Sequence, residues 1–293
     1  MSVAKPREIK RKILTIRGTR KLTHTMELVA TSRSKQNQVR MQAAKLYADG
    51  MEALVEELAG GDGLAHPLIG EPGVVQRAAV VVITSNRGLC GGFNAQVLRA
   101  TEAVLRSLAE ERATAHVYMI GKRGGARFRH AGRTVEWSST EFDDRPKVAD
   151  VNALADRLID AFLAGTVQKV VVVSARFRSA GHQPVEVTPL LPIAPLPTTA
   201  PPAHGAPHGG FLYHDGIDAM LDELLPRAVR TQLLRLLLES GTCEQIARRV
   251  AMKAATDNAD DMLKVYRRIF NRARQSSITL ELMDVIGGAS AIQ

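Results

Sequence analysis

The sequence has few cysteines, few aromatic residues and no long apolar run. Only Cys90 and Cys243 are cysteines among 293 residues, and they form no CxxC pair, so a disulfide-stabilised secreted fold is not expected. Aromatic residues make up 4%, which argues against one large globular core. No run approaches the ~20 apolar residues of a membrane-spanning helix. The charged N-terminus lacks the apolar stretch of a secretory leader, so a cytoplasmic compartment is expected.

Proline and glycine are also scarce in two long stretches at the ends of the chain. Residues 7–58 contain no proline and only the glycines Gly18 and Gly50, and residues 242–286 contain neither residue type. Because proline and glycine interrupt helices most strongly, each stretch is predicted to form one long helix. At 1.5 Å per residue, the first helix would be about 75 to 80 Å long.

Apolar residues recur at helical spacing in both stretches, but only as a narrow stripe. Helices are stabilised mainly by packing an apolar face, so neither helix is expected to be stable alone. We therefore predict that the two pack together as a long antiparallel coiled coil. The residues expected in the seam are Ile9, Ile13, Ile16, Leu22, Met26, Val29, Ser34, Asn37, Met41, Ala44, Met51, Val55 and Leu58, together with Ile246, Val250, Ala254, Met262, Val265 and Ile269.

Between these helices, apolar strands alternate with amphipathic helices. Continuous β-branched runs such as 78–84 are typical of strands that are buried on both faces. The alternation predicts a compact α/β domain with a largely parallel sheet. Strands are expected at 78–84, 116–120, 169–177 and, at an edge, 185–191, and helices at 94–111 and 148–163.

Seven of the thirteen prolines lie between Pro189 and Gly210, and this stretch is predicted to be a linker. Helix is expected to resume at Gly216, with Pro226 at a kink or a first turn and Gly241 as a weak point. The expected boundaries are 1–60 for the N-terminal helix, 75–192 for the α/β domain, 193–212 for the linker and 213–293 for the C-terminal helix.

Positive charge is concentrated near the N-terminus. The chain has a net charge of +9, and twelve Lys or Arg residues lie between Lys5 and Lys45, opposed only by Glu8 and Glu27. This distribution indicates an acidic partner, which could be nucleic acid, an anionic lipid or the acidic surface of a protein. The arm lacks aromatic residues that would stack on single-stranded nucleic acid.

The glycine-rich segment SNRGLCGGFN, residues 85–94, lies where a strand is expected to end and a helix to begin. Phosphate groups often bind at such turns, but the segment matches neither dinucleotide- nor P-loop spacing, so a tight turn is the preferred interpretation. Cys90 has no nearby histidine with an aspartate or asparagine to activate it. The basic segment GKRGG, residues 121–125, is expected to be a solvated loop.

No metal site and no catalytic group are predicted from the residues. His204, His208 and His214 lie in or just after the proline-rich stretch without further ligands at rigid spacing, so they do not indicate a metal site. Paired carboxylates and triad patterns are not recognisable either.

Three blocks resemble the gamma subunit of F-type ATP synthase. They are KLTHTMELVATSRSKQNQVRM at residues 21–41, SNRGLCGGFN at 85–94, and 244–288 with AMKAATDNA, NRARQ, SIT and the GGA ending. They span the chain from end to end in the order of that family, and the last block is highly specific.

The resemblance implies an α/β fold in which a Rossmann-like domain is inserted beside the antiparallel coiled coil. It also implies the central rotor shaft of the synthase, peripheral to the cytoplasmic face of the cell membrane. The implied partners are the alpha and beta subunits, the epsilon subunit and the membrane c-ring, without nucleic acid. ATP, ADP and magnesium would bind to partner subunits, so this chain would have no active site or cofactor of its own.

Particular residues can be carried over from the resemblance. Met26, Arg274 and Gln275 match positions that contact the catalytic beta subunit. Lys10, Arg11 and Arg33 are added as weaker candidates because of their charge. The signature loop contributes Arg87, Gly88, Cys90, Gly91 and Gly92, and departures from the family pattern occur at Asn86, Phe93, Arg249, Phe270 and Leu280.

Overall fold

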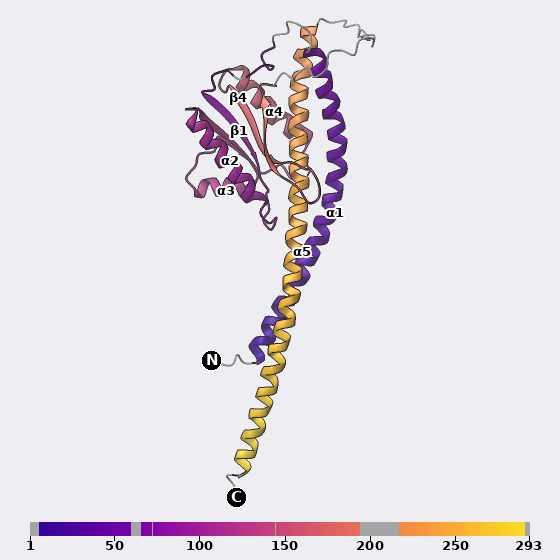
Figure 1. Cartoon of the computed structure of the whole chain (residues 1–293), viewed down its shortest axis with the longest axis vertical. Coiled ribbons are helices and arrows are strands. Elements are labelled where there is room, and N and C mark those ends of the chain that lie inside the picture. Colours follow the sequence, from indigo (N-terminus) through magenta and orange to yellow (C-terminus); the bar gives the residue numbers. More distant parts are fainter. Residues whose placement is uncertain (1–5, 60–65, 72, 144, 194–216, 291–293) are drawn as a thin grey trace. The chain divides into compact units, whose positions relative to one another are not determined.

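The computed structural model describes residues 6–59, 66–71, 73–143, 145–193 and 217–290. Within these residues, two very long helices enclose an α/β segment in the chain order (Figure 1). The elements are α1 (Pro6–Ala59), β1 (Arg77–Ile83), α2 (Phe93–Glu110), β2 (Thr114–Ile120), α3 (Lys122–His130), β3 (Trp137–Ser139), α4 (Val148–Leu163), β4 (Lys169–Ala175), β5 (Val185–Leu191) and α5 (Ile217–Ser290).

The chain divides into two compact units. The first contains the N-terminal part of α1, as far as Thr31, and the part of α5 from Arg248 onward. The second contains residues 32–247, and therefore the sheet together with the remaining parts of both long helices. Each unit is described by itself below.

In the first unit, α1 and α5 pack against each other in antiparallel orientation. Arg20 forms an ion pair with Asp260, with 2.5 Å between Nε and Oδ1. One turn further along α1, the hydroxyl of Thr23 lies 2.8 Å from that of Thr256. Towards the N-terminus of α1, Ile9 and Ile13 pack with α5 residues that include Leu263 and Ala273. The predicted antiparallel pairing is confirmed within this unit.

The seam differs from the predicted one. The expected seam residues Leu22, Val29, Val250, Met262, Val265 and Ile269 are all exposed. The buried residues of this unit are Ile9, Ile13, Thr23 and Ala30 of α1 and Arg248, Met252, Thr256, Ala259, Leu263 and Ala273 of α5, and of these Ile9 and Ile13 were expected in the seam. Their spacings are combinations of three and four residues, the period of a coiled coil. Alanine and threonine occupy much of the seam, so selecting the most apolar residues was right at Ile9 and Ile13 but gave the wrong positions around 22–29 of α1 and from 250 onward in α5.

The second unit is built on a sheet with the strand order β3-β2-β1-β4-β5. β1 pairs in parallel with β2 and β4, β2 pairs in parallel with β3, and β5 is antiparallel to β4. The apolar side chains of β1 are buried, because helices cover both faces. The predicted mainly parallel α/β sheet is confirmed.

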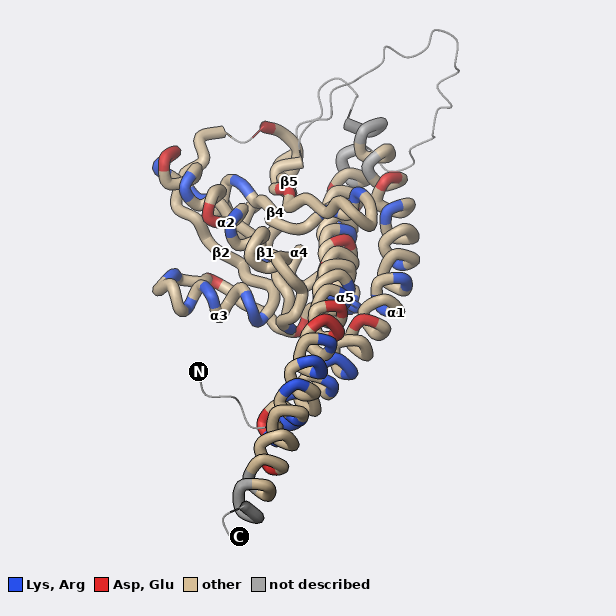
Figure 2. Tube along the Cα trace, turned by 60° about the horizontal axis from the view of Figure 1, so that its bottom comes forward, with Lys and Arg blue, Asp and Glu red and all other residues tan. Residues whose placement is uncertain are grey.

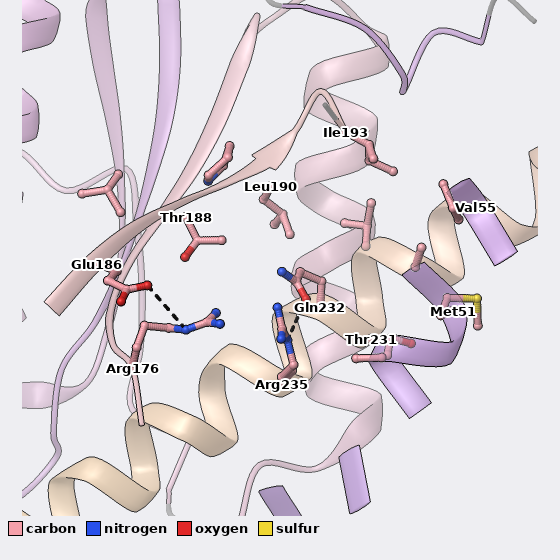
Figure 3. Close-up of a pocket in the computed structure, with 15 residues that line it drawn as sticks. Met51, Val55, Arg176, Glu186, Thr188, Leu190, Ile193, Thr231, Gln232 and Arg235 are labelled. Atoms are coloured by element: carbon pink, nitrogen blue, oxygen red, sulfur yellow. Dashed lines mark hydrogen bonds and ion pairs between the residues drawn. The ribbon is translucent and has the colours of Figure 1, made fainter. Parts of the chain in front are cut away.

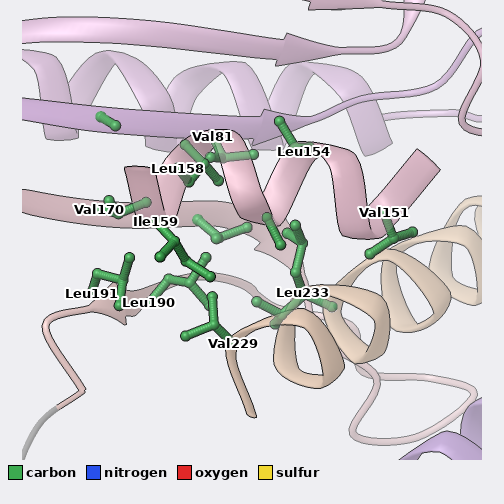
Figure 4. Close-up of a cluster of buried hydrophobic side chains, with 14 of the residues drawn as sticks. Val81, Val151, Leu154, Leu158, Ile159, Val170, Leu190, Leu191, Val229 and Leu233 are labelled. Atoms are coloured by element: carbon green, nitrogen blue, oxygen red, sulfur yellow. The ribbon is translucent and has the colours of Figure 1, made fainter. Parts of the chain in front are cut away.

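The helices form two apolar layers around this sheet. On one face, α4 and the 221–237 part of α5 pack against β1, β4 and β5 (Figure 4). Leu158 of α4 and Leu233 of α5 are completely buried there. On the other face, α2 and α3 contribute Val97, Leu108 and Phe128 to a second cluster. The sheet therefore lies between α5, which packs on one face, and α2, which packs on the other face and directly follows the glycine-rich segment.

The expectation of a loop at residues 121–125 is wrong, because this segment begins α3. Gly121 has a φ of +96°, and a Cβ there would lie 2.1 Å from the carbonyl oxygen of Thr84. A Cβ on Gly124 would lie 2.4 Å from the sulfur of Met119. These glycines permit close packing of a helix against the ends of β1 and β2. The short strand β3 was also not expected.

Pro226 lies inside α5, which continues through Gly241. The predicted linker at residues 193–212 lies outside the described residues except for Ile193, which forms an isolated bridge with Ile69. His204, His208 and His214 lie outside them as well. In the described part of the chain, no helix is long and apolar enough to cross a membrane, and no group of side chains could hold a metal ion.

Candidate functional site

Arg274 and Gln275 lie on the solvent-facing side of α5 in the first unit. The preceding residue, Ala273, is buried in the cluster formed with Ile9 and Ile13. Successive residues of a helix are turned by about 100°, so the next two side chains point away from that cluster. Both are exposed, and Arg274 makes no hydrogen bond or ion pair with any described residue. The pair is thus available to a partner.

Arg274 belongs to a group of exposed cations that we call the basic collar. Its members on α1 include Lys10 and Arg11, which lie level with the 268–272 part of α5 in the antiparallel register. Lys12 extends over the ring of Tyr266, with 5.9 Å between Nζ and the ring centroid. Figure 2 shows the concentration of blue residues on these parts of both helices. The collar consists of Arg7, Lys10, Arg11, Lys12, Arg17, Lys264, Arg267, Arg268, Arg272 and Arg274, all exposed.

Sequence reasoning identified the α1 half of the collar but missed most of the α5 half. The missed residues Lys264, Arg267, Arg268 and Arg272 occur in the run LKVYRRIFNRAR. This run has the same arrangement as the N-terminal arm, in which cations flank widely spaced seam residues. The spacing could therefore have identified them once the correct seam was known.

Met26 is half-buried and lies away from the collar. In the register fixed by Arg20–Asp260 and Thr23–Thr256, Met26 lies level with about residue 253 of α5. That position is some twenty residues from Arg274, or about 30 Å along the helix. Met26 and the Arg274–Gln275 pair therefore form two separate positions on the first unit.

Arg33 belongs to the second unit, unlike the other predicted contact residues. It is half-buried and already interacts with another residue. It is therefore a less accessible cation than Lys10 or Arg11.

Beyond the paired part of the first unit, α5 ends in exposed apolar side chains. In the antiparallel register, the described start of α1 at Pro6 lies level with about residue 273. The following turns of α5 therefore face no described residue of α1. Ile278, Leu280, Leu282, Met283, Val285 and Ile286 are between 48% and 70% exposed. Leu280, where the family pattern has a polar residue, is part of this apolar end.

The glycine-rich segment 85–94 is a turn closed by its own side chains. The side-chain amide of Asn94 makes two of these contacts. Its oxygen accepts a hydrogen bond from the Ser85 backbone N–H at 3.0 Å, and its nitrogen Nδ2 lies 3.1 Å from the sulfur of Cys90. Leu89 and Gly91 have φ values of +63° and +56°. The preferred interpretation as a tight turn agrees with this geometry.

Asn86 ties the turn to two neighbouring segments. Its Nδ2 donates to the Thr140 carbonyl at 2.9 Å and lies 3.0 Å from a carboxylate oxygen of Asp143. Its Oδ1 accepts a hydrogen bond from the backbone N–H of Lys122 at 3.0 Å. The family commonly has Asp at this position, and an aspartate would offer no donor to Asp143. The Asn86 amide therefore suits this position, because its Nδ2 can donate a hydrogen bond to the Asp143 carboxylate.

The outer side of the turn is open and basic. A hollow of about 600 Å³ is lined by Gly88, Leu89 and Gly91 of the turn and by arginines of α2 and α3. Those arginines are Arg99, Arg123 and Arg127, with Glu102 as the acidic member of the lining. Arg87 is also exposed. The turn thus presents a second cationic surface, suited to an acidic partner.

The inner side of the turn is apolar. Cys90 is buried in a cluster with Phe93, Ala175 and Cys243. Burial raises the pKa of the Cys243 thiol to about 12, and the carboxylate of Glu239 adds to the effect. A thiol with so high a pKa is not a nucleophile near neutral pH. Through this cluster the turn packs against α5.

The ATP synthase family model matches residues 5–292. An ATP synthase gamma chain of Frankia casuarinae is 39% identical over 290 residues, covering 98% of this chain and 97% of the relative. One of Gemmatimonas aurantiaca is 37% identical over 301 residues, covering 99% and 100%.

Two solved structures share the fold at low sequence identity. A chain in the F1/c-ring structure of Euglena gracilis mitochondrial ATP synthase has a TM-score of 0.67 and 16% identity, covering 98% of this chain and 94% of that one. A chain in the rotor of the same synthase has a TM-score of 0.60 and 15% identity, covering 93% and 98%. Together with the sequence matches over nearly the full length, the fold leads to one conclusion: the chain belongs to the ATP synthase gamma chain family.

Proposed function

We propose that the chain couples proton flow to ATP synthesis or hydrolysis by rotating inside an F-type ATP synthase. As a gamma chain, it is the central-stalk subunit of that complex. The observation that carries the coupling proposal is the form of the first unit, in which α5 ends in exposed apolar side chains directly beyond the basic collar. A helical stalk of this form can rotate against an apolar surface of the surrounding subunits while its cations contact acidic groups of those subunits.

The complex would supply the partners and the chemistry. We infer that the alpha and beta subunits surround the first unit, and that the epsilon subunit and the membrane c-ring contact the second. ATP, ADP and magnesium would bind to those partner subunits, and this chain would have no active site of its own. Its place would be the cytoplasmic face of the cell membrane, held there through the c-ring.

The collar would contact the beta subunit in each rotary state. Arg274 and Gln275 are proposed as the main contact pair, with Lys10 and Arg11 beside them, and Met26 as a separate contact. Exposed ion pairs contribute only about 0 to 1 kcal/mol each, because water screens them. Contacts of this strength can be broken and formed again at every step. Arg33 is the weakest candidate, because it is half-buried in the other unit.

The signature loop would form a further contact with an acidic partner segment. Arg87 and Gly88 lie on its open side, whereas Cys90 points into the protein core. Gly91 has a positive φ that a residue with a side chain rarely adopts. Gly92 precedes the first residue of α2. We infer that Arg87 makes the contact and that the other four residues maintain the shape of the turn.

The apolar end provides a direct test of the proposal. Leu282→Asp combined with Val285→Asp in the reconstituted synthase should lower ATP-driven proton pumping severalfold, since carboxylates would have to be desolvated against that apolar surface. The matched control is Leu46→Asp, because Leu46 is an exposed apolar residue of α1 in the second unit. Unchanged pumping in the double variant, or an equal loss in the control, would contradict this role of the apolar end.

A further inference from the structure

A pocket in the second unit has no role in the proposed rotary contacts. It has a volume of about 450 Å³ and lies between α1, β5 and α5. Its size falls within the range of about 300 to 1,000 Å³ that is typical of small-molecule sites. Figure 3 shows its lining, which contains apolar side chains from all three elements and two arginines.

Arg235 of α5 is the unusual residue of this pocket. It is only 8% exposed, and its one ion pair with a described residue is the 3.9 Å contact with Asp49, which is itself half-exposed. The Nε of Arg235 donates to the amide oxygen of Gln232 at 2.9 Å. Its two terminal nitrogens make no hydrogen bond with any described residue. A guanidinium that opens into a pocket and has only one long ion pair can bind an anion there, because its terminal donors are incompletely paired.

A second arginine points into the same part of the pocket. Arg176, which directly follows β4, extends toward Arg235 in Figure 3. It forms an ion pair with Glu239 at 3.0 Å and a longer one with Glu186 at 3.8 Å. Glu186 also pairs with Arg178 at 2.9 Å, so Arg176 and Arg178 together are matched by the two carboxylates. Arg235 has only the longer contact to Asp49 and is the least closely paired of these arginines.

The rest of the pocket is mostly apolar, and its other polar members are Glu186, Thr188, Thr231 and Gln232. Met51 and Val55 of α1 form part of its wall, and Leu190 and Ile193 approach from the β5 side. Ala228 of α5 also belongs to the lining. A ligand that matches this site needs an anionic head for the arginines and an apolar body for these side chains.

We propose that the pocket binds a small amphipathic anion, with its carboxylate or phosphate head on Arg235 and Arg176 and its apolar body against Met51, Val55 and Leu190. Arginine binds either head group in a two-pronged geometry. The bound molecule touches α1, β5 and α5 at once, so it should stabilise the second unit. This site is independent of the rotary contacts.

Calorimetric titration of the full-length chain tests the proposal. The probes are octanoate and octyl phosphate, with acetate and inorganic phosphate as heads without a tail and octanol as a tail without a charge. Octanoate or octyl phosphate should bind at one molecule per chain, at least about tenfold more tightly than the tail-less or uncharged probes, because a charge-assisted pair and apolar burial both contribute. The probe that binds more tightly identifies the preferred head.

Two variants and one control locate the binding. Arg235→Gln should weaken binding at least about tenfold. Arg227→Gln is the matched control, because Arg227 is an exposed arginine of the same helix that pairs with Glu223 outside the pocket, and it should bind normally. If Arg235→Gln fails to fold, Ala228→Leu decides, since it fills the apolar end and should weaken binding of the tailed probes. Equal binding of octanol, no heat at millimolar octanoate, or normal binding in the folded variants would overturn the proposal.

Discussion

The hydroxyl of Thr256 on α5 donates a hydrogen bond to the hydroxyl of Thr23 on α1 at 2.8 Å, inside the seam of the first unit. Thr23 in turn donates to the carbonyl oxygen of Arg20 at 3.0 Å. Both side chains are buried. This position would be apolar in an ordinary coiled coil, but here it holds two threonines whose hydroxyls are hydrogen-bonded. Fewer seam positions are therefore left for apolar side chains.

Removing one hydroxyl of this pair should be worse than removing both. Thr256→Val leaves a buried Thr23 hydroxyl with one partner fewer and should cost about 1 kcal/mol of unfolding free energy. The double variant Thr23→Val with Thr256→Val replaces both groups by apolar isosteres and should be close to neutral. Urea unfolding of the full-length chain, followed by circular dichroism, measures both. Additive losses in the double variant would show that the two hydroxyls do not interact.

Asn86→Asp should destabilise the signature loop, although aspartate is common there in the family. The substitution replaces the donor that faces Asp143 with a second carboxylate and so creates a like-charge contact. We expect a loss of about 1 to 3 kcal/mol at neutral pH. Adding Asp143→Asn should restore much of it, since the new amide can donate to the introduced carboxylate. Equal stability of Asn86→Asp and the unmodified chain in thermal unfolding would contradict this account.

Arg274→Ala with Gln275→Ala should lower ATP-driven turnover of the reconstituted synthase without unfolding the chain. Both side chains are exposed, so their removal leaves the seam intact. If the two exposed contacts together contribute about 0.5 to 2 kcal/mol in the rate-limiting state, their loss corresponds to roughly 2- to 30-fold in rate. Arg227→Ala, in the other unit, serves as the control with normal turnover. A normal rate in the double variant would remove these residues from the proposed contact.

Cys243 should make stability depend on alkaline pH. Burial raises the pKa of its thiol from 9.0 to about 12, so the folded state keeps a proton that the unfolded state releases. The contribution is complete below pH 9 and is lost as the pH rises toward 12. Relative to Cys243→Ala, the unmodified chain should lose about 1.4 kcal/mol between pH 7 and pH 10. A stability difference that stays constant in urea unfolding at both pH values would refute the shift.

Much of the architecture follows from local properties of the sequence. The scarcity of proline and glycine in residues 7–58 and 242–286 predicts long helices, because helix continuity depends mainly on backbone freedom. The β-branched runs at 78–84 and 169–177 predict buried parallel strands for a similarly local reason. The blocks 85–94 and 244–288 were specific enough to identify the family before any geometry was known.

Only the tertiary structure decided which side chains of these helices meet. Val250, Met262 and Val265 were expected in the seam and are exposed, whereas Thr23 and Ala259 are buried. Seam residues are selected by which face meets a neighbour, and small side chains allow the closest approach, so hydrophobicity alone is misleading. The same holds for GKRGG. A side chain at Gly121 would collide with Thr84, and one at Gly124 would collide with Met119, so both glycines depend on residues outside their own helix.

The sequence by itself determined the family, the long helices and the strands, because these depend on residues close together in the chain. The tertiary structure decided the seam, the separation of Met26 from Arg274, and the meeting of Arg176 with Arg235 in one pocket. Thr23 and Thr256 of the seam are 233 positions apart in the chain, and Arg176 and Arg235 are 59 apart. Their geometry is set by how the helices and the sheet pack, which no local pattern specifies.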